Sequence, residues 1–213
     1  MGESGCGKST LAKTLVYLDP ATSGEFFWQG VKVAFNNKSH IDQLRKDVQL
    51  IFQDPYSALH PYKTVGRALE EVLFVHSSKS NIDYSQRVIE LLSKVGLDSE
   101  YRNRYPHELS GGQCQRVVIA RALAVEPKVL ICDESVAALD ISVQAQVLNL
   151  LNDLKRDLGL SYIFISHDLA VVKYMSDRIM VMQNGSLVEL QEADKLYKNP
   201  KNAYTKKLID AIP

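Results

Sequence analysis

The chain has 213 residues, enough for one globular domain with a sizeable core. Basic and acidic residues number 25 each, so the zero net charge gives no overall attraction to nucleic acid or to an anionic membrane surface. No apolar stretch approaches the roughly 20 residues that span a bilayer, so we expect any membrane contact to go through a partner. Cys6, Cys114 and Cys132 lie far apart without C-x-x-C spacing, which favours free thiols over a zinc site or disulfides.

The first half of the chain predicts short strands followed by a helical region. The expected early elements are a helix over residues 8–18, a hairpin over 25–35 with a break at Gly30, and a strand over 48–53. From about residue 64 to 105 apolar side chains recur at helical spacing, and residues 110–125 predict one more helix. We therefore expect a helical subdomain over about 64–125, inserted in a sheet domain.

The second half alternates strands and helices. The expected elements are strands over 128–132, 161–166, 178–182 and 186–190, and helices over about 141–158 and 168–175. The strand KVLIC is continuously apolar, as a parallel strand buried on both faces is, and Asn184-Gly185 predicts a hairpin turn. This pattern predicts a single α/β domain over residues 1–213, with a mostly parallel sheet flanked by helices and a small antiparallel β part.

The clearest motif is GESGCGKST at residues 2–10, which matches G-x-x-x-x-G-K-[ST]. Its glycines let backbone N–H groups curl around a β-phosphate, and the helix that follows presents its N-terminus to the anion. Lys8 would reach the β- and γ-phosphates, and the Ser9 hydroxyl would bind Mg²⁺. The alternative is a chance glycine-rich turn before a helix. The residues expected to bind the nucleotide here are Gly2, Glu3, Ser4, Gly5, Cys6, Gly7, Lys8, Ser9 and Thr10.

Two acidic residues follow the buried strand in VLICDE, residues 129–134. A parallel strand delivers them to its carboxyl end, where ligands of α/β sheets bind. Asp133 can hold Mg²⁺ through water, and Glu134 can polarise the attacking water as a general base. Two acids in a loop after a strand are common by themselves, but the upstream phosphate loop favours the functional interpretation.

The third motif is LSGGQ at the start of a predicted helix. Two glycines at a helix start form an anion-binding concavity, although Ser110 alone would be explained as a simple helix cap. The residues of this motif are Leu109, Ser110, Gly111, Gly112 and Gln113.

The order of these motifs resembles the nucleotide-binding domain of ABC ATPases, a P-loop NTPase family, over nearly the whole chain. The resemblance implies that Gln53 approaches Mg²⁺ and the water, that Asp140 belongs to the D-loop at 137–140, and that His167 contacts the γ-phosphate. Alone, a Gln or His after a strand would be solvated or would cap a helix. The resemblance also implies a head-to-tail dimer, with each ATP between one phosphate loop and the partner's LSGGQ.

These inferences give a full set of expected ligands and roles. ATP and Mg²⁺ are the expected ligands. The expected catalytic residues are Glu134, His167 and Gln53, and the expected metal ligands are Ser9, Gln53 and Asp133. Asp140 and the LSGGQ residues complete the expected nucleotide contacts.

A finer resemblance concerns three segments, FQDPYSALHP (52–61), DESVAALDISVQAQVLNLL (133–151) and NPKNAYTKKLIDAIP (199–213), which are similar to the oligopeptide/dipeptide importer branch. It implies that residues 192–213 begin that branch's C-terminal extension. It further implies an ATPase that powers uptake of peptides or a similar small solute at the cytoplasmic face of a prokaryotic membrane. The implied partners are membrane permease subunits, a second ATPase subunit and, indirectly, a solute-binding protein, with no nucleic acid.

The sequence also departs from the family pattern. Ala137 stands where the D-loop usually has serine, which implies altered communication across the dimer. The family places a β-strand and an adenine-stacking aromatic residue before the phosphate loop, and here the loop begins at Gly2. We therefore expect an N-terminally truncated chain of low stability by itself. The alternatives are a non-hydrolysing remnant, a non-transport ABC ATPase acting on DNA or ribosomes, and a small-molecule kinase.

Overall fold

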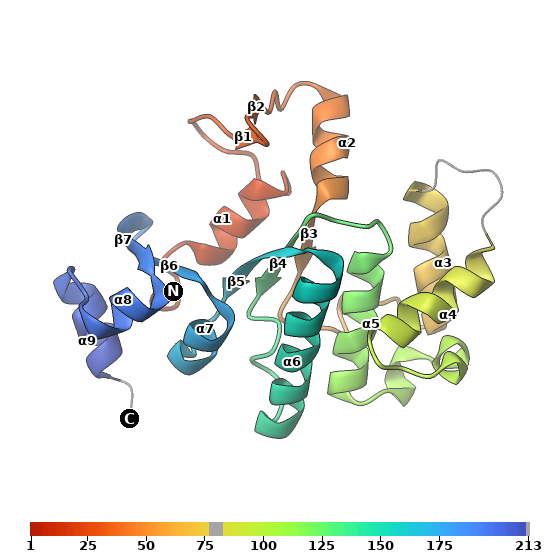
Figure 1. Ribbon diagram of the computed structural model, residues 1–213. Coiled ribbons are helices and arrows are strands. Elements are labelled where there is room, and N and C mark those ends of the chain that lie inside the picture. The colour runs from red at the N-terminus through yellow and green to blue at the C-terminus, as the bar shows by residue number, and fades with distance from the viewer. Residues whose placement is uncertain (77–82, 212–213) are drawn as a thin grey trace. The chain divides into compact units, whose positions relative to one another are not determined.

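Figure 1 shows the computed structural model, which describes residues 1–76 and 83–211. The chain divides into two compact units. The first unit combines Met1–Ala21 with Phe164–Pro213, and the second unit is Thr22–Ile163. In the described residues, no helix combines the length and apolarity needed to cross a bilayer.

The second unit contains a parallel sheet, a hairpin and most of the helices. Its strands are β1 (Phe27–Trp28), β2 (Val31–Lys32), β3 (Val48–Ile51), β4 (Val129–Asp133) and β5 (Ser161–Ile165), whose last two residues belong to the first unit. Its helices are α2 (Lys38–Asp47), α3 (Val65–His76), α4 (Tyr84–Lys94), α5 (Gly111–Leu123) and α6 (Ile141–Leu158), with short 3₁₀ turns η1 (Ser99–Asn103) and η2 (Pro106–Glu108).

Strand β4 is the middle strand of a three-stranded sheet with the order β3-β4-β5. Strands β3 and β4 run parallel, in register from Val48 opposite Val129 to Ile51 opposite Cys132. Leu130, Ile131 and Cys132 have no exposed side-chain surface. The continuous apolar run in the sequence therefore reflects burial on both faces, as predicted.

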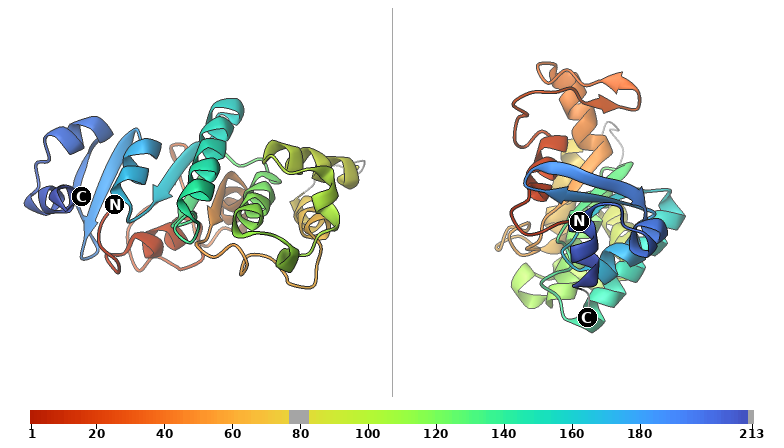
Figure 2. Two further views of the ribbon diagram at one scale, coloured as in Figure 1. Left: turned by 90° about the horizontal axis from the view of Figure 1, so that it is seen from below. Right: turned by 90° about the vertical axis from the view of Figure 1, so that its left-hand side faces the viewer.

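Helices α3, α4 and α5 pack side by side (Figure 2). Their contact faces bury Leu69, Val88, Leu91 and Leu92 completely. The Asp83 side chain caps α4 by accepting a hydrogen bond from the Gln86 amide at 3.1 Å. This helical group coincides with the region in which the sequence shows helical periodicity.

The β1–β2 hairpin is joined to the sheet through Asp47, which is buried at the end of α2. Its Oδ2 accepts hydrogen bonds from Trp28 Nε1 at 2.8 Å and from Lys128 Nζ at 3.1 Å. The hairpin turn places Gln29 and Gly30 at φ +50° and +79°, the backbone region that two-residue hairpin turns require. The predicted break at Gly30 is therefore the turn itself.

The first unit is built around an antiparallel pair, β6 (Arg178–Gln183) and β7 (Ser186–Glu192). Its helices are α1 (Lys8–Leu15), α7 (Leu169–Met175), α8 (Ala193–Lys198) and α9 (Ala203–Asp210). Its core contains Val172, Ile179, Val181 and Leu196, against which Leu208 and Ile209 of α9 pack. The turn between the strands is Asn184-Gly185, as predicted, with φ +49° and +77°.

The fold class expected from the sequence is confirmed: a parallel sheet with helices and a smaller antiparallel part. Some expected boundaries are wrong: the strand predicted over 48–53 ends at Ile51, the strand predicted over 186–190 continues to Glu192, and the helix predicted over residues 8–18 ends at Leu15. Tyr17 then adopts a left-handed φ of +55°, two residues before Asp19-Pro20. Helices α2, α8 and α9 were not predicted.

Candidate functional site

The phosphate loop occupies the start of the first unit and leads directly into α1. Gly7 caps the helix with φ +99°, and Gly5 has φ +79° with open space where a Cβ would lie. The first turn of α1 carries no acidic residue. The partial positive charge of this helix end is therefore uncompensated by its own side chains, as suits an anion ligand.

Only glycine fits at position 2, because the backbone there lies very close to the backbone of β6. Its φ is +147°, and a Cβ at this position would lie 2.2 Å from the Met182 carbonyl oxygen. A side chain would also approach the Cys6 sulfur to 2.8 Å. The first glycine of the motif thus allows both the positive φ of the loop and its close contact with β6.

Lys8 points back into the loop. Its side chain is buried, and Nζ donates hydrogen bonds to the Gly2 carbonyl at 2.8 Å and the Glu3 carbonyl at 2.7 Å. The ammonium group is thereby held among the backbone groups that the motif predicts will surround a phosphate.

Three other segments of the first unit hold the loop. Met1 pairs with β6, because its amino group donates to the Met180 carbonyl and its carbonyl accepts from the Met182 amide at 2.8 Å. The β6–β7 turn adds a hydrogen bond of 3.0 Å from the Gly185 amide to the Cys6 carbonyl. From α9, the Tyr204 hydroxyl accepts a hydrogen bond of 3.1 Å from the Glu3 amide.

His167 lies exposed between β5 and α7. The Asp168 side chain caps α7 by accepting hydrogen bonds from the amides of Ala170 and Val171 at 2.9 and 3.1 Å. The buried Ser166 hydroxyl accepts a hydrogen bond from the Asp168 amide at 3.0 Å. The backbone around His167 is thus fixed while its imidazole reaches solvent.

In the second unit, Asp133 and Glu134 stand at the carboxyl end of β4. Asp133 is the last residue of the strand and is buried. Glu134 adopts a left-handed φ of +49°, and its carbonyl accepts a hydrogen bond of 3.0 Å from the Ala137 amide. Such a conformation costs a non-glycine residue about 1–3 kcal/mol and is concentrated at functional sites.

The buried cysteines of this unit remain protonated thiols. Burial raises the pKa of Cys132 to about 12, against a smaller opposing effect of a hydrogen bond with Ser135. Burial, and then the charge of Asp54, raise the pKa of Cys114 to about 11. A thiol with so high a pKa is a poor nucleophile.

The LSGGQ motif forms the N-terminus of α5. Ser110 Oγ accepts a hydrogen bond from the Gln113 amide at 3.3 Å, and Gln113 Oε1 accepts from the Ser110 amide at 3.0 Å. This reciprocal capping arrangement satisfies two amides at the helix start. Gln113 Nε2 also donates to the Tyr101 hydroxyl at 2.9 Å, so the motif is tied to η1.

The second unit brings LSGGQ together with the expected D-loop and with the segment after β3. A Cβ on Gly112 would lie 2.3 Å from Val143 Cγ1, and one on Gly111 would lie 3.4 Å from Leu139. The Tyr56 hydroxyl donates to the Leu109 carbonyl at 3.1 Å. Tyr56 was not among the predicted site residues, and its only sequence signal was its place in the 52–61 segment.

Asp140 caps α6 at the end of the expected D-loop. Its Oδ1 accepts hydrogen bonds from the Val143 amide at 3.0 Å and from the Ser142 hydroxyl at 2.9 Å. The Val143 amide, and next the Ser142 hydroxyl, lower the pKa of Asp140. Its carboxylate therefore stays ionised in the neutral range.

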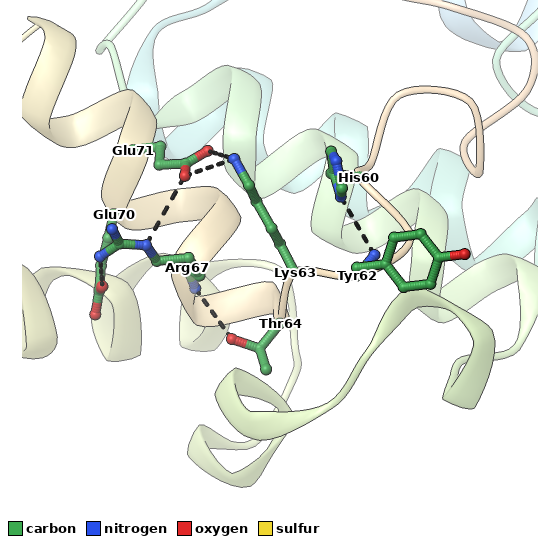
Figure 3. Close-up of polar contacts among 7 residues, drawn as sticks. All are labelled: His60, Tyr62, Lys63, Thr64, Arg67, Glu70 and Glu71. Carbon is green, nitrogen blue, oxygen red and sulfur yellow. Dashed lines mark hydrogen bonds and ion pairs between the residues drawn. The ribbon is translucent and has the colours of Figure 1, made fainter.

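Gln53 is exposed just beyond β3, next to a groove of the second unit. The groove lies between the segment after β3 and helices α3 and α5, and its lining includes Phe52, Ala58, Val72, Val75, His76 and Arg121. At one end of it, Lys63 Nζ donates to both Glu71 oxygens at 2.7 and 2.8 Å (Figure 3). The hydrogen bond from Lys63 is the largest cause that lowers the pKa of Glu71.

The predicted site residues thus fall into two groups. The first unit carries the phosphate loop and His167, and the second carries Gln53, LSGGQ, Asp133, Glu134 and Asp140. Within the first unit the loop offers an anion site: an uncompensated helix N-terminus, open space at Gly5 and the Lys8 ammonium. These features fit a nucleotide phosphate. Mg²⁺ at such a site is held by one or two protein oxygens with phosphate and water, and the Ser9 hydroxyl of this unit is an oxygen of that kind.

Comparison with known proteins identifies the family. The family described as ABC transporter matches residues 1–137. The chain is 51% identical to oligopeptide transport ATP-binding protein OppF of Bacillus subtilis and 46% identical to dipeptide transport ATP-binding protein DppF of Escherichia coli. All of this chain is covered in both comparisons. It spans 70% of the Bacillus subtilis protein and 64% of the Escherichia coli protein.

Solved structures agree with the sequence relatives. The structure of cbiO1 from Clostridium perfringens, part of the ABC transporter complex cbiONQ, matches 100% of this chain and 82% of its own, with a TM-score of 0.83 and 28% identity. A dimeric ATP-binding cassette in a post-hydrolysis state with ADP and Pi matches 91% of this chain and 83% of its own, with a TM-score of 0.79 and 30% identity. The P-loop NTPase fold expected from the motifs is thereby confirmed, and this chain belongs to the ABC transporter family of ATP-binding proteins.

Proposed function

We propose that this chain is the ATP-hydrolysing subunit of an ABC importer for peptides or a similar small solute. The observation that carries the proposal is the phosphate loop, in which Lys8 is buried among backbone groups at the N-terminus of α1. The identity of about 50% to oligopeptide and dipeptide transport proteins supports the solute class.

In this proposal the loop binds the phosphates of ATP. The residues from Gly2 to Thr10 surround them, and the Lys8 ammonium turns from the Gly2 and Glu3 carbonyls toward the β- and γ-phosphates. The exchange is favourable because Lys8 then bonds to charged oxygens in place of neutral carbonyls.

The proposal assigns a role in hydrolysis to each of the predicted catalytic residues. Glu134 acts as the general base that polarises the attacking water, and Gln53 and His167 orient the water and the γ-phosphate. Ser9, Asp133 and Gln53 are the residues that would hold Mg²⁺, which would supply positive charge to neutralise the phosphate oxygens. The left-handed φ of Glu134, directly after β4, supports this role, because strained backbone of this kind is concentrated at functional sites.

A second ATPase subunit completes the site in this proposal. The LSGGQ residues and Asp140 of one chain would face the ATP held by the phosphate loop of the other. The capped N-terminus of α5, with two glycines in its first turn, supports an anion contact there. Ala137 lacks the hydroxyl usual at this place, so we expect weaker communication between the two ATP sites.

The remaining partners follow from the same assignment. Permease subunits would bind at the groove beside Gln53, at the cytoplasmic face of a prokaryotic membrane, with a solute-binding protein acting through them. Residues 64–125 would form the helical subdomain of one nucleotide-binding domain, and residues 192–213 would begin a C-terminal extension. The groove supports the permease contact, since exposed apolar side chains such as Phe52 and Val75 line it.

The test of hydrolysis compares two glutamates with the same backbone conformation. Glu134→Gln should retain ATP binding and lower kcat by about 10²- to 10⁴-fold, because the general base is removed. Glu126→Gln is the matched control, since Glu126 also has a left-handed φ, of +55°, but precedes β4, whereas Glu134 follows it. ATP turnover at the wild-type rate in Glu134→Gln would refute the assignment. Binding without turnover in the unaltered chain would favour the non-hydrolysing alternative.

A further inference from the structure

The C-terminal part of the first unit reaches the phosphate loop through one side chain. Tyr204, the second residue of α9, accepts a hydrogen bond from the Glu3 amide, with 3.1 Å between its hydroxyl oxygen and the nitrogen. The two residues are 201 positions apart in the sequence. Both lie in the same compact unit.

Tyr204 is held in place by a chain of contacts that starts on β7. The buried carboxylate of Glu189 accepts hydrogen bonds from the amides of Lys201 and Asn202, at 2.9 and 3.0 Å. Asn202 in turn caps α9 by accepting a hydrogen bond from the Tyr204 amide at 2.8 Å. The start of α9 is therefore fixed at the residues next to Tyr204.

The peptide that Tyr204 contacts also holds Lys8. The Glu3 amide belongs to the peptide unit whose carbonyl is that of Gly2, and this carbonyl accepts a hydrogen bond from Lys8 Nζ at 2.8 Å. In a trans peptide the N–H and C=O groups point in opposite directions. One peptide plane is thus fixed on one side by Tyr204 and on the other by Lys8.

We propose that Tyr204 is a positioning residue for the phosphate loop, and that it couples α9 to nucleotide binding. It keeps the Gly2–Glu3 peptide of the loop in one fixed orientation, so less ordering of the loop is needed when phosphates bind. Coupling is reciprocal, so bound nucleotide stabilises α9 as much as α9 stabilises the bound state. This inference rests on the proposed nucleotide binding.

Tyr204→Phe tests the inference, with Tyr197→Phe as a matched control. The Tyr197 hydroxyl donates to the Leu169 carbonyl and its ring packs on the same core, but it makes none of the loop contacts described above. Loss of one hydrogen bond predicts about two- to tenfold weaker binding of Mg·ADP by Tyr204→Phe in isothermal titration calorimetry. We expect KM for ATP to rise by the same factor with kcat unchanged. Tyr197→Phe should lower thermal stability without changing Mg·ADP affinity.

Hydrogen exchange supplies a measurement that needs no variant. Amides of α9 should exchange more slowly when Mg·ADP is bound to the wild-type chain, and unchanged exchange would contradict the coupling. Equal affinities of Tyr204→Phe and the wild type, or equal losses in both tyrosine variants, would overturn the positioning role.

Lys8→Ala distinguishes a failure of the positioning role of Tyr204 from a failure of the proposed nucleotide binding. If the wild type binds Mg·ADP, Lys8→Ala does not, and Tyr204→Phe binds as the wild type does, only the positioning role fails. If the wild-type chain binds no Mg·ADP, the proposed nucleotide binding fails and the inference falls with it.

Discussion

At the scale of single residues, the phosphate loop and the LSGGQ motif each contain a glycine whose missing side chain makes room for other atoms. Gly2 approaches the Met182 carbonyl, and Gly112 approaches Val143. The motif identifies both positions in the sequence. The motif does not show that Gly2 is needed for the contact with β6, or that Gly112 is needed for the packing of α5 against α6.

Gly2→Ala should therefore weaken nucleotide binding by at least about tenfold, because the loop must move to relieve a contact of 2.2 Å. The measurement is Mg·ADP affinity together with thermal stability. Gly24→Ala is the control, since Gly24 also has a positive φ, of +103°, but open space around its Cβ position. It should cost about 1 kcal/mol of stability and leave affinity unchanged. Equal affinity in the two variants would show that the contact with Met182 is unimportant.

At the scale of elements, the strongly periodic or continuously apolar segments were predictable and the short capped helices were not. Strand β4 and helix α6 follow directly from their sequences, since burial dictates their composition. Helix α2 buries only Leu44 and Asp47, and α9 buries only Thr205 completely, so neither has the long series of buried apolar side chains that marks α6. These helices depend on caps and distant partners, such as Asn37 for α2 and Glu189 for α9.

The docking of α9 should depend on pH through Glu189. Burial alone would raise its pKa, but the hydrogen bonds that its carboxylate accepts hold the pKa at about 2, below its ordinary value of 4.5. A lowered folded-state pKa means that the stabilisation is present above about pH 4.5 and is lost as the pH falls toward 2. Protection of the α9 amides, corrected for the intrinsic pH dependence of amide exchange, should decrease over that range.

Glu189→Gln provides the matching variant, because glutamine keeps the shape but loses the charge that the Lys201 and Asn202 amides bind. Its α9 amides should be less protected than those of the wild type at neutral pH, and their protection should not change with acid over the same range. An unchanged acid response in the variant would assign the pH dependence to another group.

At the scale of the whole molecule, the sequence selects candidate site residues but not the contacts that hold them. Residue types and motif order are enough to propose Lys8, Asp133 and Glu134, because phosphate and metal chemistry favour such residues. The supporting contacts of Tyr56 and Tyr204 join segments about 50 and 200 residues apart, and no local pattern specifies such pairs. Met1 likewise pairs with β6, a contact that we did not predict for a loop that begins at Gly2.

The groove beside Gln53 gives a test of the proposed transport role. Val75 lies at its edge on the last turn of α3, with 73% of its surface exposed. Val75→Lys should leave folding and basal ATPase activity unchanged, since the side chain already faces solvent and a cation suits a helix C-terminus. It should reduce co-purification with the permease subunits and solute uptake, because a desolvated charge would be left in an apolar contact.

Leu158→Lys is the matched control, an exposed leucine in the last turn of α6 that lines none of the described groove. It places the same charge at an equivalent helix position, so it should leave permease association and uptake at wild-type levels. If both variants lose uptake equally, the effect is one of surface charge and the groove is not the permease contact. If Val75→Lys alone loses uptake while basal ATP turnover persists, the defect lies in the transfer of the ATPase cycle to the membrane subunits, as the importer assignment requires.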